Sequence, residues 1–107
     1  ELYPAASLAA AGIPLLGGSD APYASADPWL AMRSAVTRRI ADGAVLGPRQ
    51  RLAPMQALQL YCRGEIAPGA SADLILCQGT LADVLADFTS ERLGLTLIAG
   101  RLVFRSP

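Results

Sequence analysis

An uncharged stretch near the N-terminus ends abruptly at an acid. Residues 2–18 include no charged side chain, and Ser19 and Asp20 follow at once. Within this stretch, residues 13–16 form an apolar segment bounded by turn residues, which is typical of a strand covered on both faces. Burial accounts for the apolar residues but not for Asp20. This acid is either a turn or helix-capping residue, or a reactive group at the rim of a sheet or barrel.

Helix signals flank the predicted strand on both sides. Helices are predicted over residues 4–12, 27–43 and 54–62. The second has Asp27 as its N-cap, Pro28 at its first position and Gly43 at its end. Its buried side is expected to carry residues that recur at helical spacing, namely Trp29, Met32, Val36 and Ile40. The order helix, strand, helix is typical of an α/β unit.

The second half of the sequence changes to the period of strands. A strand is predicted over residues 72–77, a short helix or turn over 80–88, and a β-hairpin over 95–105 that turns at Ala99 and Gly100. Three short strands do not form a stable sheet alone, because their edges stay exposed. We therefore expect them to complete a sheet with strands that this sequence does not supply, and to leave a large apolar patch.

Composition excludes some partners. The chain has 107 residues, of which 52% are hydrophobic, so it is one small domain or a part of a larger one. All nine basic residues are arginine, His and Lys are absent, and the net charge is zero. This balance argues against nucleic acid as a partner, since phosphate binding needs a net basic face. Arginine and alanine in place of lysine and asparagine suggest a bacterial source with GC-rich coding.

Neither cysteine usage nor the apolar N-terminus indicates export. Cys62 and Cys77 lie in hydrophobic surroundings and are expected to be buried free thiols, although a disulfide between them stays open. The N-terminal run lacks a basic start and is interrupted by Pro4, Gly12 and Pro14, so no membrane segment or signal peptide is predicted. The expected compartment is the cytoplasm.

Four segments of the chain read, in this order, GIPLLGGSDAPY, DPWLAMRSAVTR, EIAPGASADLIL and TLIAGRLVF. They resemble the C-terminal region of the amidohydrolase superfamily, in particular amidohydrolase family 3. The resemblance implies an α/β fold in two parts. Residues 1–63 would hold the last strand and helices of a TIM-type (β/α)8 barrel, and residues 64–107 would hold strands of a small composite β-sandwich domain.

The resemblance also implies a site. In this family an Asp at the end of the last barrel strand completes a metal-centred site at the mouth of the barrel, and Asp20 matches it. Asp20 would contact a divalent metal, with zinc expected, and act as general base. Without the resemblance, an Asp in a Ser-Asp-Ala-Pro turn is more often a cap. Arg38 matches an arginine of the family pattern, which either approaches substrate or is an exposed or barrel-bracing residue on a helix face.

The sequence departs from the family pattern in two ways. Family members bind metal through several histidines and often a carboxylated lysine, and this sequence has no His and no Lys. One carboxylate does not hold a catalytic zinc, so the chain alone is expected to bind no metal tightly and to be inactive. The family also has about twenty more residues between Cys62 and Gly64. A shortened helix or a missing segment is expected there, and missing sequence is expected before Glu1.

The resemblance implies metal-dependent hydrolysis of carbon–nitrogen bonds other than peptide bonds, as in amides or cyclic amides. The partners would be a small amide-type substrate, together with the rest of the barrel or a second copy of the chain. The alternative is a non-catalytic binding or assembly module. A His-x-His pair upstream of this sequence would favour the enzyme, and a start codon near Glu1 would favour the module.

Overall fold

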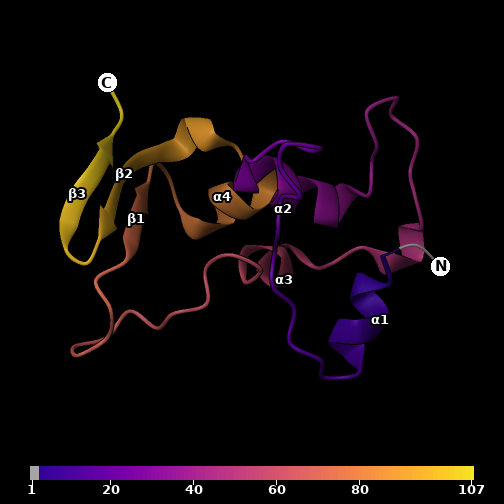
Figure 1. Ribbon diagram of the computed structural model, residues 1–107, viewed down its shortest axis with the longest axis horizontal. Coiled ribbons are helices and arrows are strands. Elements are labelled where there is room, and N and C mark those ends of the chain that lie inside the picture. The colour runs from indigo at the N-terminus through magenta and orange to yellow at the C-terminus, as the bar shows by residue number, and fades with distance from the viewer. Residues whose placement is uncertain (1–2) are drawn as a thin grey trace. The chain divides into compact units, whose positions relative to one another are not determined.

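The fold was analysed in a computed structural model, which describes residues 3–107. The chain divides into two compact units, Glu1–Cys62 and Arg63–Pro107. The helical elements of the first unit are α1 (Ala5–Ala10), α2 (Pro28–Thr37), a 3-10 turn η1 (Pro48–Gln50) and α3 (Pro54–Leu58). The second unit contains β1 (Leu74–Cys77), α4 (Leu81–Asp87), a 3-10 turn η2 (Ser90–Arg92), β2 (Leu93–Ile98) and β3 (Arg101–Arg105) (Figure 1).

The start of α2 confirms the local signals in the sequence, whereas its end does not. The Asp27 carboxylate accepts the amide of Trp29 at 2.9 Å, and Pro28 occupies the first turn. The helix ends at Thr37, because Arg38 takes a left-handed conformation with φ 57°. The predicted end at Gly43 was therefore wrong. Gly43 instead lies in a loop, at φ 87°.

The core of the first unit forms where α2 packs against α3. The exposed fractions of Trp29 and Met32 are 6% and 2%, and Leu52 and Ala57 are buried with them. Val36 is half-buried, and Ile40 is exposed because the helix ends before it. The predicted apolar side of this helix is thus confirmed for its first two residues and wrong for Ile40.

The predicted strand over residues 13–16 is absent from the structure, in which this segment belongs to no sheet. A strand needs a neighbour to complete its backbone hydrogen bonds, and none of the described residues 3–107 forms a ladder with it. The segment is held at its two ends instead. The amide of Ile13 donates to Leu8 O at 3.1 Å, and the amide of Gly17 donates to Leu60 O at 3.0 Å.

The second unit is built on an antiparallel sheet with strand order β1-β2-β3, which Figure 1 shows side by side. The predicted strand and hairpin are confirmed. The hairpin turns at Ala99 and Gly100, whose φ angles of 49° and 74° are both positive, as a two-residue turn of this kind requires. The turn is tied to the start of β1, because Ala99 N donates to Asp73 Oδ1 at 2.8 Å and Gly100 N to Ala72 O at 3.0 Å.

The predicted helix of the second half is confirmed as α4, and its cap explains why it starts where it does. Thr80 Oγ1 accepts the amide of Asp83 at 3.2 Å, while the Asp83 carboxylate accepts the amide of Thr80 at 2.7 Å. This reciprocal pair satisfies two backbone donors at the helix start. The helix ends at Asp87, because Phe88 takes a left-handed conformation with φ 44°. Phe88 is buried together with Val84.

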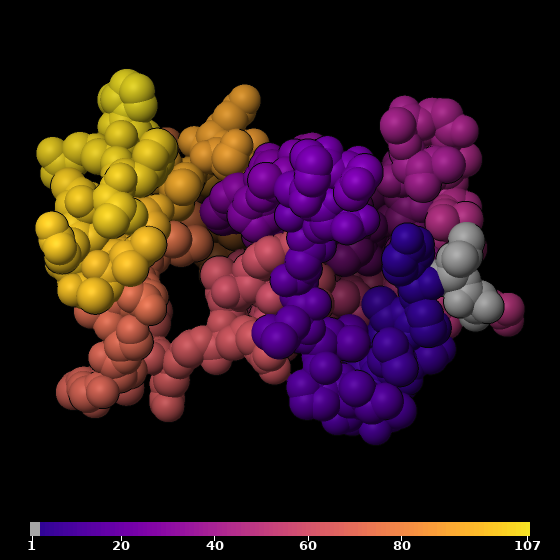
Figure 2. All heavy atoms as spheres, in the orientation of Figure 1, coloured from indigo at the N-terminus to yellow at the C-terminus, as the bar shows by residue number. Residues whose placement is uncertain are grey.

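The sheet of the second unit exposes large apolar side chains. Exposed fractions between 42% and 60% are found for Ile75, Leu76, Ile98, Leu102, Val103 and Phe104. Cross-strand pairing places Ile75 and Phe104 on one face, each opposite Thr96, and Leu76 on the other, opposite Leu95. The atoms of the hairpin, in yellow in Figure 2, are uncovered on the face toward the viewer. Exposed apolar surface of this kind, here on both faces of the sheet, usually marks an interface or a missing partner, as the sequence predicted.

Neither cysteine forms a disulfide within residues 3–107, which agrees with the expectation of thiols. Cys77 is half-buried, but Cys62 is exposed, so its expected burial was wrong. None of the helices within residues 3–107 is long and apolar enough to span a membrane.

Gln50 provides a first test of this architecture. It is only 5% exposed, and its Oε1 accepts the amide of Ser7, in the first turn of α1, at 3.0 Å. Its Nε2 donates to Ser7 Oγ at 2.7 Å. Gln50→Ala should lower the free energy of unfolding by about 1–3 kcal/mol, because a helix-start amide loses its partner.

Ser7→Ala is the matched control. It removes the hydroxyl but keeps the hydrogen bond from the backbone amide of residue 7 to Gln50 Oε1. It should cost less, about 0.5–1.5 kcal/mol. Urea unfolding followed by the fluorescence of Trp29, the one tryptophan of the chain, measures both values. An equal or larger loss in Ser7→Ala would contradict the capping role of Gln50.

The Asp87–Arg92 pair provides a test by pH. Arg92 Nη2 lies 2.7 Å from Asp87 Oδ2, and this hydrogen-bonded guanidinium holds the pKa of Asp87 below its ordinary value. The pair therefore stabilises the second unit fully above the unfolded-state pKa of about 3.9, and its contribution is lost as the pH falls through the lower folded-state pKa. Asp87→Asn should reduce amide-exchange protection in α4 at about pH 5, and the difference from wild type should shrink toward about pH 2.

Asp42→Asn, in the first unit, is the control and should leave the protection of α4 unchanged at every pH. A difference between wild type and Asp87→Asn that persists undiminished at the acid end would show that the pair acts through packing and not through charge.

Candidate functional site

Asp20 lies in a tight turn that follows the extended segment. Its backbone is left-handed, with φ 55°, a region in which Asp is tolerated better than most residues. Its carbonyl oxygen accepts the amides of Tyr23 at 3.0 Å and Ala24 at 3.3 Å. Ser19 Oγ accepts the amide of Ala21 at 3.2 Å, so the turn is closed by backbone groups and the serine hydroxyl.

The Asp20 carboxylate takes no part in closing this turn. It is exposed, and within residues 3–107 it has no hydrogen-bond or ion-pair partner. The other aspartates of the chain all accept hydrogen bonds through their carboxylates. These are Asp27, Asp42, Asp73, Asp83 and Asp87. Asp20 therefore differs from the other aspartates of the chain.

The turn is anchored at Gly17, three residues before Asp20. Besides the hydrogen bond to Leu60, the backbone of Gly17 lies against the ring of Tyr61, which is half-buried. Leu60 and Tyr61 lie two and three residues beyond the end of α3 at Leu58, so the end of this helix determines the path of the segment that carries the acid.

The structure shows how Arg38, the second residue singled out from the sequence, is used within the first unit. Its Nε donates to Leu46 O at 2.8 Å, and its own carbonyl oxygen accepts the amide of Leu46 at 2.8 Å. These bonds brace the loop that follows α2. No hydrogen bond or ion pair among residues 3–107 joins Arg38 to Asp20, and its substrate-binding role stays a prediction.

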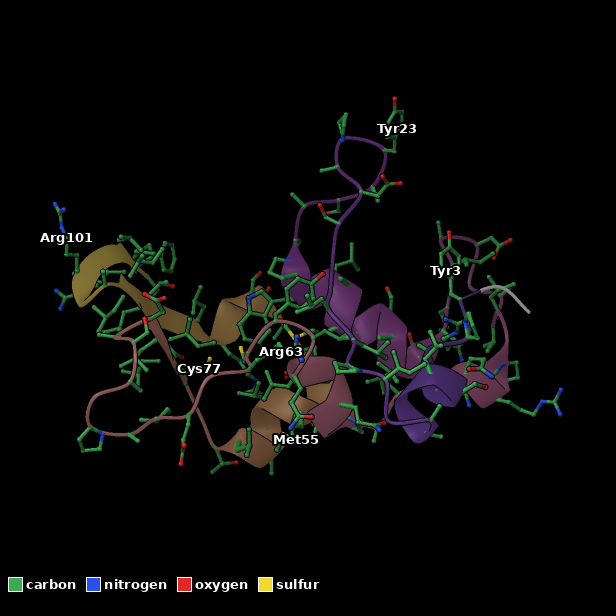
Figure 3. The ribbon with its side chains drawn as sticks, turned by 60° about the horizontal axis from the view of Figure 1, so that its bottom comes forward. Tyr3, Tyr23, Met55, Arg63, Cys77 and Arg101 are labelled. Atoms are coloured by element: carbon green, nitrogen blue, oxygen red, sulfur yellow. The ribbon has the colours of Figure 1, made fainter. Side chains whose placement is uncertain are left out.

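Tyr23 is a residue at this turn that the sequence reasoning did not single out. Its exposed fraction is 91%, and Figure 3 shows it at the tip of the loop, pointing away from the helices of the first unit. The signal that could have found it is an aromatic residue in a polar Pro turn directly after a candidate acid. An exposed aromatic ring at this place is suited to contact a substrate or a neighbouring segment.

The donors of this chain do not fit a complete metal site. Within residues 3–107, no three His, Cys, Asp or Glu side chains lie close enough together to hold a metal ion, and the sequence contains no histidine. A catalytic zinc needs three protein ligands, whereas Asp20 can supply one.

Comparison with known proteins identifies the family. The family model described as amidohydrolase family matches residues 1–104, which is nearly the whole chain. No curated protein and no solved structure was found to match the chain significantly. The match extends through the Asp20 turn, α2, β1 and β2, and into β3. On this match, the chain belongs to the amidohydrolase family.

Proposed function

We propose that this chain is the C-terminal part of a metal-dependent amidohydrolase that hydrolyses carbon–nitrogen bonds other than peptide bonds, and that Asp20 is its general base. Family membership supports hydrolase chemistry on small molecules at the level of the family. The order of the motifs along the chain, with GGSDAP before the second helix and the hairpin last, supports the C-terminal position.

The observation that carries this proposal is the carboxylate of Asp20, which has no hydrogen-bond or ion-pair partner within residues 3–107. A capping aspartate has its oxygens occupied by amides, as Asp27 has. Asp20 instead sits in a turn whose hydrogen bonds are complete without it, so both oxygens can accept a proton or a ligand bond. A solvent-facing acid at the end of an extended segment suits an open site better than a folding role.

The chemistry asked of Asp20 is proton transfer in two directions. Hydrolysis of an amide needs water to add to the carbonyl carbon and to lose a proton as the new C–O bond forms. Asp20 accepts this proton and returns it to the leaving nitrogen as the C–N bond breaks. The carboxylate ends each cycle deprotonated, so a single acid serves both steps without a further proton source.

The metal is assigned to the assembled enzyme and not to this chain. Amidohydrolases are generally metal-dependent, and we propose zinc as the divalent ion. Asp20 would supply one ligand oxygen, and the remaining ligands would be histidines outside this sequence, which itself has none. The substrate class proposed is small amides or cyclic amides, with Arg38 kept as a candidate substrate contact.

One observation favours the alternative of an assembly module. The sheet of the second unit leaves apolar side chains exposed on both faces, and a surface of this kind usually marks an interface. The two functions are compatible if the sheet joins the rest of the enzyme. An activity measurement distinguishes them, because the function of a pure assembly module would not depend on the charge of Asp20.

Asp20→Asn tests the catalytic proposal in the full-length enzyme that contains this sequence. The amide keeps the size of the side chain but cannot accept a proton, so kcat should fall by at least about a hundredfold. The free energy of unfolding should change by less than about 1 kcal/mol, because the carboxylate makes no hydrogen bond within residues 3–107.

Asp27→Ala is the matched control. It removes an aspartate that does cap a helix, and should cost about 0.5–2 kcal/mol of stability while the folded enzyme keeps its kcat. Steady-state kinetics and urea unfolding are measured on both variants and on wild type. A well-folded Asp20→Asn enzyme with near-normal kcat would refute the role proposed for this acid.

A further inference from the structure

We propose that Tyr61 is a positioning residue for the Asp20 turn, and that residue 17 is a glycine because the Tyr61 ring leaves no room for a β-carbon. The geometry that points to this lies within the first unit. A β-carbon built on Gly17 would lie 2.5 Å from Tyr61 Cε2 and 2.8 Å from its hydroxyl oxygen, and it would also overlap Cζ. Real β-carbons do not approach other atoms so closely.

The neighbouring glycine shows that this contact is specific. A β-carbon on Gly18 would meet nothing within 4 Å. Neither glycine has the positive φ that would by itself favour glycine. Backbone conformation therefore does not explain why residue 17 is a glycine, whereas the Tyr61 ring does.

Two consecutive residues thus hold the segment at one point. Leu60 accepts the amide of Gly17 at 3.0 Å, and Tyr61 covers its α-carbon. The hydrogen bond sets the distance between the segment and the end of α3, and the ring blocks a shift or rotation of the backbone toward it. Since residues 13–16 have no sheet to align them, this contact fixes their direction as they enter the turn.

The turn itself transmits this position to the acid. Residues 19–24 are closed by their own hydrogen bonds, from Ala21 to Ser19 and from Tyr23 and Ala24 to Asp20. A closed turn moves as a unit, so a displacement at Gly17 displaces the carboxylate. A misplacement of about 1 Å can cost about a hundredfold in rate. The catalytic consequence rests on the proposed role of Asp20, whereas the contact between Gly17 and Tyr61 does not.

The test is a double-mutant cycle with a matched glycine control. Gly17→Ala should shift the urea midpoint of unfolding to lower denaturant, and Gly18→Ala should leave it near wild type. In a Tyr61→Ala background, Gly17→Ala should lower the urea midpoint by much less, because the ring that the new β-carbon would strike is gone. If Gly17→Ala fails to fold, folding of the double variant supports the contact, and failure of the double variant as well overturns it.

Kinetics of the full-length enzyme separate positioning from stability. Tyr61→Ala and Gly17→Ala should lower kcat by about tenfold to a hundredfold with a smaller change in KM, since the misplaced acid reacts poorly with bound substrate. Tyr61→Phe keeps the ring and should restore most of the kcat lost in Tyr61→Ala. The double variant should recover stability but not kcat.

Each outcome is decisive for this proposal. Equal effects of alanine at residues 17 and 18 would overturn the contact, and a folded Tyr61→Ala enzyme with normal kcat would overturn the positioning role. Near-normal kcat in Asp20→Asn would overturn the proposed role of the acid, yet the stability coupling between residues 17 and 61 would survive. The two failures are therefore distinguishable.

Discussion

The hydrogen bond from the Gly17 amide to the Leu60 carbonyl oxygen ties the segment that carries Asp20 to the end of α3. In a barrel this path would be set by ladders to two neighbouring strands. Here the ladder partners are absent from the described residues, and the segment depends on its end contacts. The packing of α2 on α3 supports those contacts in turn, because the buried ring of Trp29 and the side chain of Met32 belong to the same small core.

Asp20 is used differently from the other aspartates of the chain, which complete the architecture in both units. In the second unit the carboxylates complete the architecture: Asp73 holds the hairpin turn, Asp83 caps α4, and Asp87 binds Arg92. In the Asp20 turn a serine hydroxyl and the backbone do the equivalent work. An acid that is not needed for folding can be used for chemistry. This division supports the catalytic proposal for Asp20 more directly than its position in the sequence does.

Local signals predicted the elements whose causes are local. The N-cap of α2, the short helix α4 and the Ala-Gly hairpin turn depend on residues a few positions apart, and all three were confirmed. The strand over residues 13–16 failed because strand pairing depends on a partner, which a window of sequence does not contain. Gly43 was misassigned because a glycine ends a helix and turns a loop equally well. The free carboxylate of Asp20 and the contact between Gly17 and Tyr61 depend on side-chain positions, which only coordinates give.

The two hydrogen bonds that join the hairpin turn to the start of β1 bear on where this chain tolerates changes in length. They fix the register of the sheet from Ala72 onward. Residues 63–71, which precede them, are exposed. Within this stretch the amide of Ala70 donates a hydrogen bond to Ala67 O, which closes a turn. Insertions or deletions in this stretch would alter neither the core of the first unit nor the pairing of the strands. Relatives can therefore drift in length at this junction while each unit keeps its own hydrogen bonds.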